Sequence, residues 1–274
     1  MERKKNTDVI AITDYSPVGN AAVLHAASLA RFFESTLTIV TNFSFEPLRQ
    51  FRFANGDFHT VLQQAQSMVE VTVNEMPFQP EGLHAMAESA NHIMYVIGVS
   101  RNSTAQFNPS RALKFIAPSR LPVMAVGEAP VGDPLWQNIL LSVDVDLPAK
   151  EKALWAGYFN RYGKSNIHIL HNEYQDSISK DKLSDLMDFI NKLYENLEIT
   201  PVPHIITPKA YNLDQYAVEH ADDYQGAALV VMTTTHKTFI DRIFGTREKQ
   251  LLANPQNLPV LFINERDDLF VLCA

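Results

Sequence analysis

The fold is decided by residues 9–14, VIAITD, because the chain contains a second version of this stretch, ILLSVD, at residues 139–144. The offset of 130 positions persists into the next apolar run, where LTIVTN at 37–42 matches IHILHN at 167–172 without a gap. Self-similarity at a long and regular period indicates a duplicated structural unit. The chain is therefore interpreted as a tandem duplication.

The two copies are separated by residues 127–134, GEAPVGDP, which hold two glycines and two prolines. Such a composition is typical of a linker. A length of 274 residues also suits two ordinary domains. We expect a first domain over residues 1–129 and a second over residues 135–274.

Each copy alternates apolar strands with helical segments. In the second copy we expect strands near 138–145, 166–173, 200–207, 227–233 and 259–264, and helices near 149–162, 178–196, 212–223 and 241–253. The strands are apolar without alternation, as when helices cover both faces of a parallel sheet. The predicted fold class is α/β, with two tandem doubly wound five-stranded parallel-sheet domains of Rossmann-like type. In the first copy the second helix is expected at about 58–68.

Composition excludes several classes of function. The formal net charge of −8 argues against non-specific nucleic-acid binding, which needs a basic surface. No apolar stretch approaches the roughly 20 residues that cross a bilayer, so no membrane partner is expected. The only cysteine is Cys273, which fits a reducing, cytoplasmic setting.

An aspartate ends the first strand of each copy, Asp14 in one and Asp144 in the other. In a doubly wound sheet the carboxyl ends of the strands form the ligand crevice. A carboxylate there either accepts hydrogen bonds from a ribose or caps the helix that follows. The repetition favours a role set by the fold, but it leaves both alternatives open.

Each unit of about 130 residues has an apolar strand that ends in Asp and a last helix followed by Leu-Pro-Val, at 121–123 and at 258–260. In these features the chain resembles a tandem universal stress protein over nearly its whole length. The resemblance implies a pseudo-dimer, in which the final strands near Val123–Val126 and Val260–Ile263 pair within one chain. It leaves open whether whole chains also form a homodimer.

In nucleotide-binding members of that family, the loop between the fourth strand and the fourth helix carries Gly, two residues, Gly, nine residues, Gly, then Ser or Thr. The second copy keeps the closing pair, Gly245-Thr246, but places Met232 and Thr235 where the first two glycines belong. Glycine lets the backbone adopt a positive φ and lets N–H groups approach phosphate closely. A β-branched threonine does neither well, so the loop is predicted to be degenerate.

The first copy departs from the pattern in another way. Gly98 keeps the first position, Arg101 replaces the second glycine, and Pro109-Ser110 takes the place of the closing pair with the interval two residues short. Proline also removes a backbone donor. Neither copy keeps the whole pattern, so no cofactor is certain and binding of ATP or AMP is predicted to be weak or absent. Residual binding would use these residues: Asp144, Thr233, Thr235, Gly245 and Thr246 in the second copy, and Asp14, Gly98 and Ser110 in the first.

Catalytic and metal-binding patterns are not found. His168 and His171 are three positions apart in an expected strand, so they point to opposite faces and cannot share a metal ion. The sequence contains no nucleophile elbow and no Walker-type Gly-Lys-Ser/Thr. We predict no catalytic residue and no metal site.

Three functions therefore compete. The first is a non-catalytic universal stress protein that acts in a stress response by binding a small ligand or a partner. The second is an adenine-nucleotide-binding or ATP-hydrolysing α/β protein that uses the second domain. The third is an interaction module whose sites have filled in. The degenerate loops favour the first and third over the second.

Overall fold

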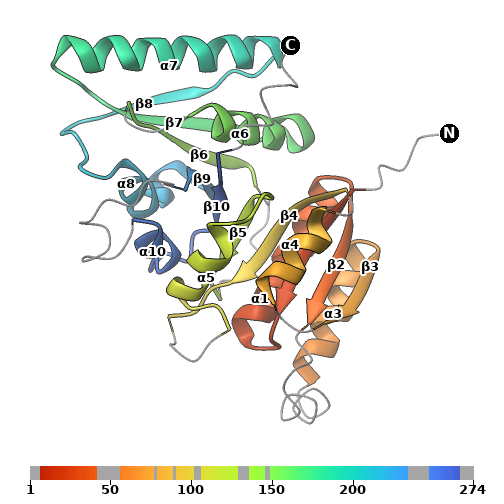
Figure 1. Cartoon of the computed structure of the whole chain (residues 1–274). Helices are drawn as coiled ribbons and strands as arrows, with labels where there is room; N and C mark the ends of the chain where they lie inside the picture. The colour runs from red at the N-terminus through yellow and green to blue at the C-terminus, as the bar shows by residue number, and fades with distance from the viewer. Residues whose placement is uncertain are drawn as a thin grey trace. The chain divides into compact units, whose positions relative to one another are not determined.

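A computed structural model describes residues 7–41, 56–76, 79–88, 91–101, 106–128, 136–145, 149–233 and 247–265, except for the side chains of 56–57 and 86–88. The chain divides into two compact units, Met1–Leu135 and Trp136–Ala274 (Figure 1).

The described residues of the first unit form five strands and the helices between them. In chain order these are β1 (Asp8–Thr13), α1 (Pro17–Phe32), β2 (Thr36–Thr41), α3 (Gly56–Met68), β3 (Val71–Glu75), α4 (Pro80–Glu88), β4 (His92–Gly98), α5 (Pro109–Ile116) and β5 (Val123–Val126). The strands lie in the order β3-β2-β1-β4-β5, and every neighbouring pair is parallel. The helix expected at about 58–68 is confirmed as α3.

The second unit repeats this arrangement. Its elements are β6 (Asn138–Val143), α6 (Lys150–Gly163), β7 (Asn166–Asn172), α7 (Ser177–Asn196), β8 (Val202–Ile206), α8 (Leu213–Glu219), a 3₁₀ helix η1 (Ala221–Tyr224), β9 (Ala228–Met232), α10 (Arg247–Leu252) and β10 (Val260–Ile263). The strand order β10-β9-β6-β7-β8 is the first unit's order in another numbering, again with parallel neighbours. The fold class predicted from the sequence is confirmed. The helix expected from residue 241 is described only from Arg247 onward, where α10 begins.

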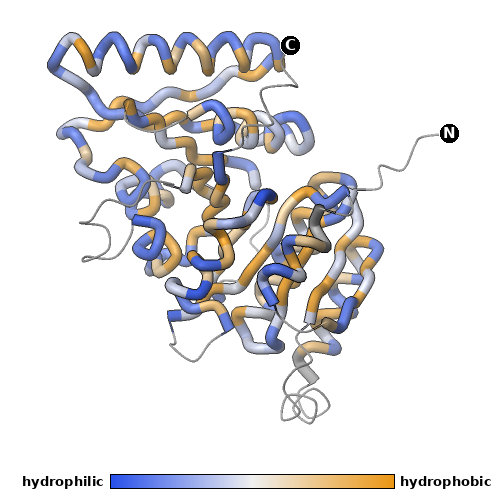
Figure 2. The backbone as a smooth tube through the Cα atoms, in the orientation of Figure 1, coloured by the Kyte–Doolittle hydropathy of each residue, from blue (hydrophilic) through white to orange (hydrophobic). Residues whose placement is uncertain are grey.

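The central strands of both units are almost wholly buried. Every residue of β9 is buried, and so is all but the first residue of β1 and of β6. Figure 2 shows the hydrophobic colour following the strands, while the helices alternate between hydrophilic and hydrophobic residues. A parallel sheet covered by helices on both faces requires this pattern.

The strand order also places the crevice of each unit. In the second unit α6 packs against α7, whereas α8 packs against α10 and against β6, β7 and β9. Because crossovers between parallel strands are right-handed, the helices change faces where the strand order reverses, between β1 and β4 and between β6 and β9. Ligands of doubly wound sheets bind at the carboxyl ends of the strands at this point. In the described part of the chain no helix combines the length and apolar character needed to cross a membrane.

Candidate functional site

The predicted site residues fall at these two crevices as far as the structure describes them. Asp14 directly follows β1, and Gly98 ends the neighbouring β4. Asp144 directly follows β6, and Thr233 directly follows the neighbouring β9. Ser110 lies in the first turn of α5. Thr235, Gly245 and Thr246 lie outside the described residues, so their proposed role stays a prediction.

Asp14 is held by hydrogen bonds from its own unit. Its Oδ1 accepts hydrogen bonds from the backbone N–H of Ser16, at 3.1 Å, and from the Ser16 hydroxyl. Its Oδ2 accepts one from the N–H of Gln106, at 3.3 Å, in the connection from β4 to α5. Ser16 in turn caps α1, because its Oγ accepts from the N–H of Gly19. Asp14 therefore orients the residue that caps α1, and a ribose would have to compete for its carboxylate.

Gly98 is required by packing at the end of β4. A Cβ atom at this position would lie 2.1 Å from the carbonyl oxygen of Val18 and 3.0 Å from the backbone nitrogen of Gly19. Distances this short cannot be relieved by turning a side chain, since both partners are backbone atoms of α1. The absence of a side chain at Gly98 thus lets the first turn of α1 rest directly on the strand end.

The N-terminus of α5 is already occupied by a side chain. Asn108 Oδ1 accepts hydrogen bonds from the N–H groups of Ser110 and Arg111, at 3.1 and 3.0 Å. Free N–H groups of a first helical turn are what attract an anion. Here Asn108 binds two of them, and Pro109 has no N–H to offer. Ser110 is therefore part of a conventionally capped helix start.

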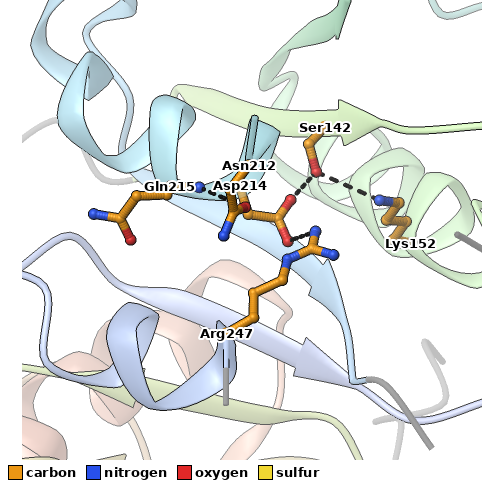
Figure 3. Close-up of polar contacts among 6 residues, drawn as sticks. All are labelled: Ser142, Lys152, Asn212, Asp214, Gln215 and Arg247. Carbon is orange, nitrogen blue, oxygen red and sulfur yellow. Dashed lines mark hydrogen bonds and ion pairs between the residues drawn. The ribbon is translucent and has the colours of Figure 1, made fainter. Parts of the chain in front are cut away.

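The second unit holds a polar cluster made of residues that are not among the predicted site residues (Figure 3). Asp214, on α8, accepts a hydrogen bond from the Ser142 hydroxyl and forms an ion pair with the guanidinium of Arg247. Lys152 Nζ donates to Ser142 Oγ at 3.4 Å. We call Ser142, Lys152, Asp214 and Arg247 the crevice cluster. Its members come from β6, α6, α8 and α10, so four elements converge where β6 ends.

Local structure sets each of these side chains. Asn212 caps α8 by accepting a hydrogen bond from the N–H of Gln215 at 3.2 Å, which fixes Asp214 in the first turn of that helix. Lys152 is in the first turn of α6, and Arg247 begins α10. The first turn of each helix therefore brings its charged side chain to the end of the sheet.

The crevice cluster is unusual for its burial. Lys152 and Asp214 are each 1% exposed, and the Arg247 side chain is 23% exposed. Burial lowers the pKa of Lys152 from its ordinary value, and the positive charge of Arg247 lowers it further, whereas the negative charges of Asp214 and Asp144 raise it. Charges taken out of water need a close partner of opposite sign. Asp214 is the ion-pair partner of Arg247, and its negative charge also acts on Lys152.

Thr233 makes contacts with the end of β10. Its backbone N–H donates to the carbonyl oxygen of Ile263 at 2.8 Å, and its hydroxyl donates to the same oxygen at 3.1 Å. The side chain of Asn264 also contacts this hydroxyl. In this arrangement Thr233 ties β9 to β10, and its hydroxyl proton is already used.

The repeat itself carried a signal for the crevice cluster. At the offset of 130, Ser142 corresponds to Ile12 and Lys152 to Ala22. Ile12 and Ala22 are buried in the core of the first unit. A hydroxyl and an ammonium at positions that are apolar and buried in the other copy indicate a local polar network. No comparable pattern links Asp214 to Arg247, which are 33 positions apart.

Neither a known family model nor a curated protein matches this sequence. Solved structures do match. A universal stress protein from Archaeoglobus fulgidus aligns with a TM-score of 0.70 at 14% identity, over 94% of this chain and 98% of the other. The chain has the universal stress protein fold. A functionally unknown protein from Pseudomonas aeruginosa PAO1 aligns with a TM-score of 0.58 at 12% identity, over 97% of this chain and 94% of the other. The likeness to the universal stress protein extends over both units, and at this identity it concerns the fold.

Proposed function

We propose that this protein is a non-catalytic universal stress protein that acts in a stress response by binding a small ligand or a partner, and that it binds ATP and AMP weakly or not at all. The observation that carries the proposal is the crevice cluster. It occupies the carboxyl end of β6, beside the crevice where a doubly wound sheet holds its ligand.

A nucleotide in the second unit would have to break existing interactions. Phosphate groups need cations and backbone N–H groups as partners. The guanidinium of Arg247 is paired with Asp214, and Lys152 lies in the same buried network. Drawing Arg247 toward a phosphate would break its ion pair with the buried carboxylate of Asp214, which is strongly unfavourable.

The first unit supports the same proposal by a different arrangement. The Asp14 carboxylate already accepts three hydrogen bonds, and Asn108 caps the helix start that would face an anion. The backbone of α1 fills the space beside Gly98. The Asp14 carboxylate and the N–H of Ser110 are thus engaged within the protein.

The crevice cluster also argues against catalysis by Ser142. A serine nucleophile must be reachable and must pass its proton to a base. Ser142 is fully buried, donates its proton to Asp214, and accepts a hydrogen bond from Lys152. The Ser142 proton is therefore directed at Asp214, and the buried hydroxyl is out of reach of a substrate.

The alternative is a nucleotide-binding or ATP-hydrolysing protein that uses the second unit. The observation in its favour is the presence of two cationic side chains, Lys152 and Arg247, beside the carboxyl end of the sheet. Residual binding would then rely on Asp144 and Thr233 together with the predicted Thr235, Gly245 and Thr246.

Calorimetric titration of the full chain with Mg-ATP and with AMP separates the two functions. The proposal expects no saturable heat at micromolar nucleotide and no phosphate release above the rate without protein. Micromolar binding that is lost in Asp144→Ala would refute the proposal and establish the alternative. Micromolar binding that survives Asp144→Ala would refute it as well and place the nucleotide elsewhere.

The same proposal covers the assembly and the location of the protein. We propose pairing of the two domains within the chain, a cytoplasmic location, and no association with nucleic acid or membranes. Whether whole chains also form a homodimer is measured directly by sedimentation of the purified protein.

A further inference from the structure

Two histidines meet on neighbouring strands of the second unit, away from the crevice. His168 is the third residue of β7, and His204 is the third residue of β8. The Nδ1 atom of His168 lies 2.9 Å from the Nε2 atom of His204, and the planes of the two rings differ by 13°. Both side chains are half-buried. Spacing along the chain relates His168 only to His171 on the same strand, and it gives no sign of the partner on the next strand.

Hydrogen bonds around Asn138 determine which ring nitrogens carry protons. Asn138 Nδ2 donates to the carbonyl oxygen of Gln225 at 3.2 Å, so its Oδ1 faces the strands as an acceptor. Nε2 of His168 lies 3.2 Å from that oxygen and is therefore the protonated nitrogen of its ring. The lone pair of His168 is then on Nδ1, and His204 donates to it through Nε2.

The contacts of His168 resemble those of an imidazole that binds a metal through one ring nitrogen and donates a hydrogen bond from the other. Histidines that bind metals almost always donate their other ring N–H to an oxygen, which fixes the orientation of the ring. Asn138 plays that part for His168. Burial lowers the pKa of both His168 and His204 from the ordinary value. Both rings are therefore neutral at pH 7, as metal ligation requires.

The number and type of the donors favour particular metals. The hydrogen bond of 2.9 Å between the rings holds two imidazole nitrogens close together, so that both can turn toward one ion. Zn²⁺ sites use three or four protein ligands, and this pair supplies two. Cu²⁺ and Ni²⁺ accept tetragonal coordination by nitrogen and oxygen, in which water completes the set, and Cu²⁺ binds a given nitrogen site more tightly than Zn²⁺.

The remaining coordination positions fall to water. Within the described residues no group of three or more histidine, cysteine or acidic side chains could hold a metal ion. The Tyr224 ring lies 4.7 Å from that of His204, and burial raises the pKa of Tyr224 to about 12. Its phenol therefore stays protonated at neutral pH and is a poor ligand.

We propose that His168 and His204 bind one divalent transition-metal ion, Cu²⁺ or Ni²⁺ in preference to Zn²⁺, through Nδ1 and Nε2 respectively. On binding, two metal–nitrogen bonds replace two metal–water bonds of the hydrated ion, and the hydrogen bond between the rings breaks. The proton on Nε2 of His204 moves to Nδ1 of the same ring through water, so no net proton is released. The site lies near the amino-terminal ends of the strands, so it stands or falls independently of the proposed function.

The experiment uses the full chain without an affinity tag, after removal of metals by a chelator. CuCl₂, NiCl₂ and ZnCl₂ are titrated into the protein by calorimetry at pH 7.5. We expect one equivalent of Cu²⁺ or Ni²⁺ to bind more tightly than Zn²⁺, with a heat that does not depend on the ionisation enthalpy of the buffer. A lack of saturable Cu²⁺ and Ni²⁺ binding overturns the proposal.

Matched variants assign the site. His168→Gln and His204→Gln are each expected to weaken binding at least tenfold, and Asn138→Ala about tenfold through loss of ring orientation. His171→Gln is the control, because His171 is on the same strand and contacts the carbonyl oxygen of Asn172 instead. Binding that survives both substitutions, or that is lost equally in the control, overturns the proposal. The metal-induced rise in the unfolding midpoint gives a second measurement: it is expected in the wild type and in the control but not in His204→Gln.

Discussion

Replacing Asp214 by asparagine tests whether the crevice cluster stabilises the second unit. The change keeps the shape of the side chain and removes its charge, which leaves Lys152 and Arg247 without their common partner. Removing one partner of a buried ion pair costs about 3–5 kcal/mol of unfolding free energy. Because the Arg247 side chain is 23% exposed and water reaches it, we expect a loss near the lower end, about 3 kcal/mol.

Urea unfolding followed by tryptophan fluorescence measures this loss in the unit concerned. The two tryptophans, Trp136 and Trp155, both belong to the second unit, and Trp136 is buried. With a denaturant slope of about 2 kcal/mol per molar, a loss of about 3 kcal/mol lowers the urea midpoint by roughly 1.5 M.

A double-mutant cycle separates charge from packing. Lys152→Met removes the buried ammonium that Asp214→Asn leaves uncompensated, so the double variant should be more stable than the sum of the single changes predicts. We expect a coupling free energy of about 1–3 kcal/mol. A single-variant loss below about 1 kcal/mol, or strictly additive losses, would show that the crevice cluster does not stabilise the unit through its charges.

Three further predictions follow from particular contacts. Gly98→Ala should lower the unfolding free energy of the first unit by about 1–3 kcal/mol, because the added Cβ meets the backbone of α1; unfolding is followed by far-ultraviolet circular dichroism. In the control Gly82→Ala the nearest contact of the added Cβ is 3.8 Å, and the change should be less than about 1 kcal/mol. Equal losses in the two variants would contradict the packing role of Gly98. Asn108→Ala should cost about 1 kcal/mol as a lost helix cap while Asn108→Asp keeps most of it, so similar losses in both would be evidence against capping. Because folding lowers the pKa values of His168 and His204, the unfolded chain binds more protons below pH 6.5, and the second unit should lose stability as the pH falls through 6.5. Thermal unfolding from pH 7.5 to 5 should show a shallower loss in the double variant His168→Gln, His204→Gln. An unchanged dependence of stability on pH in that variant would refute the role of the two histidines.

The fold could be predicted from the sequence because the relevant signals are local. Residues 9–14 and 139–144 are apolar runs that end in an aspartate, and the same run of residues decides both strand formation and burial. The same pattern occurs in both copies, so each weak local signal is supported twice. The helix expected at about 58–68 is found as α3, Gly56–Met68.

The candidate site was only partly predictable. The sequence places Asp14 at the end of the first strand. It does not decide whether the carboxylate binds a ribose or caps a helix, since both roles use the same side chain in the same position. The structure shows a third arrangement, in which Asp14 orients the capping residue Ser16 and binds Gln106 across the crevice. The Gln106 contact spans 92 positions, and no local pattern announces it.

By itself the sequence determined that the chain is two copies of one doubly wound sheet, because hydrophobic periodicity is a property of neighbouring residues. Only the tertiary structure decided what fills the second crevice. Ser142, Lys152, Asp214 and Arg247 belong to four different elements, and their pairing follows from the way α6, α8 and α10 pack around the end of β6. Two buried charges interact according to their separation in space rather than along the chain, and packing of the helices sets that separation.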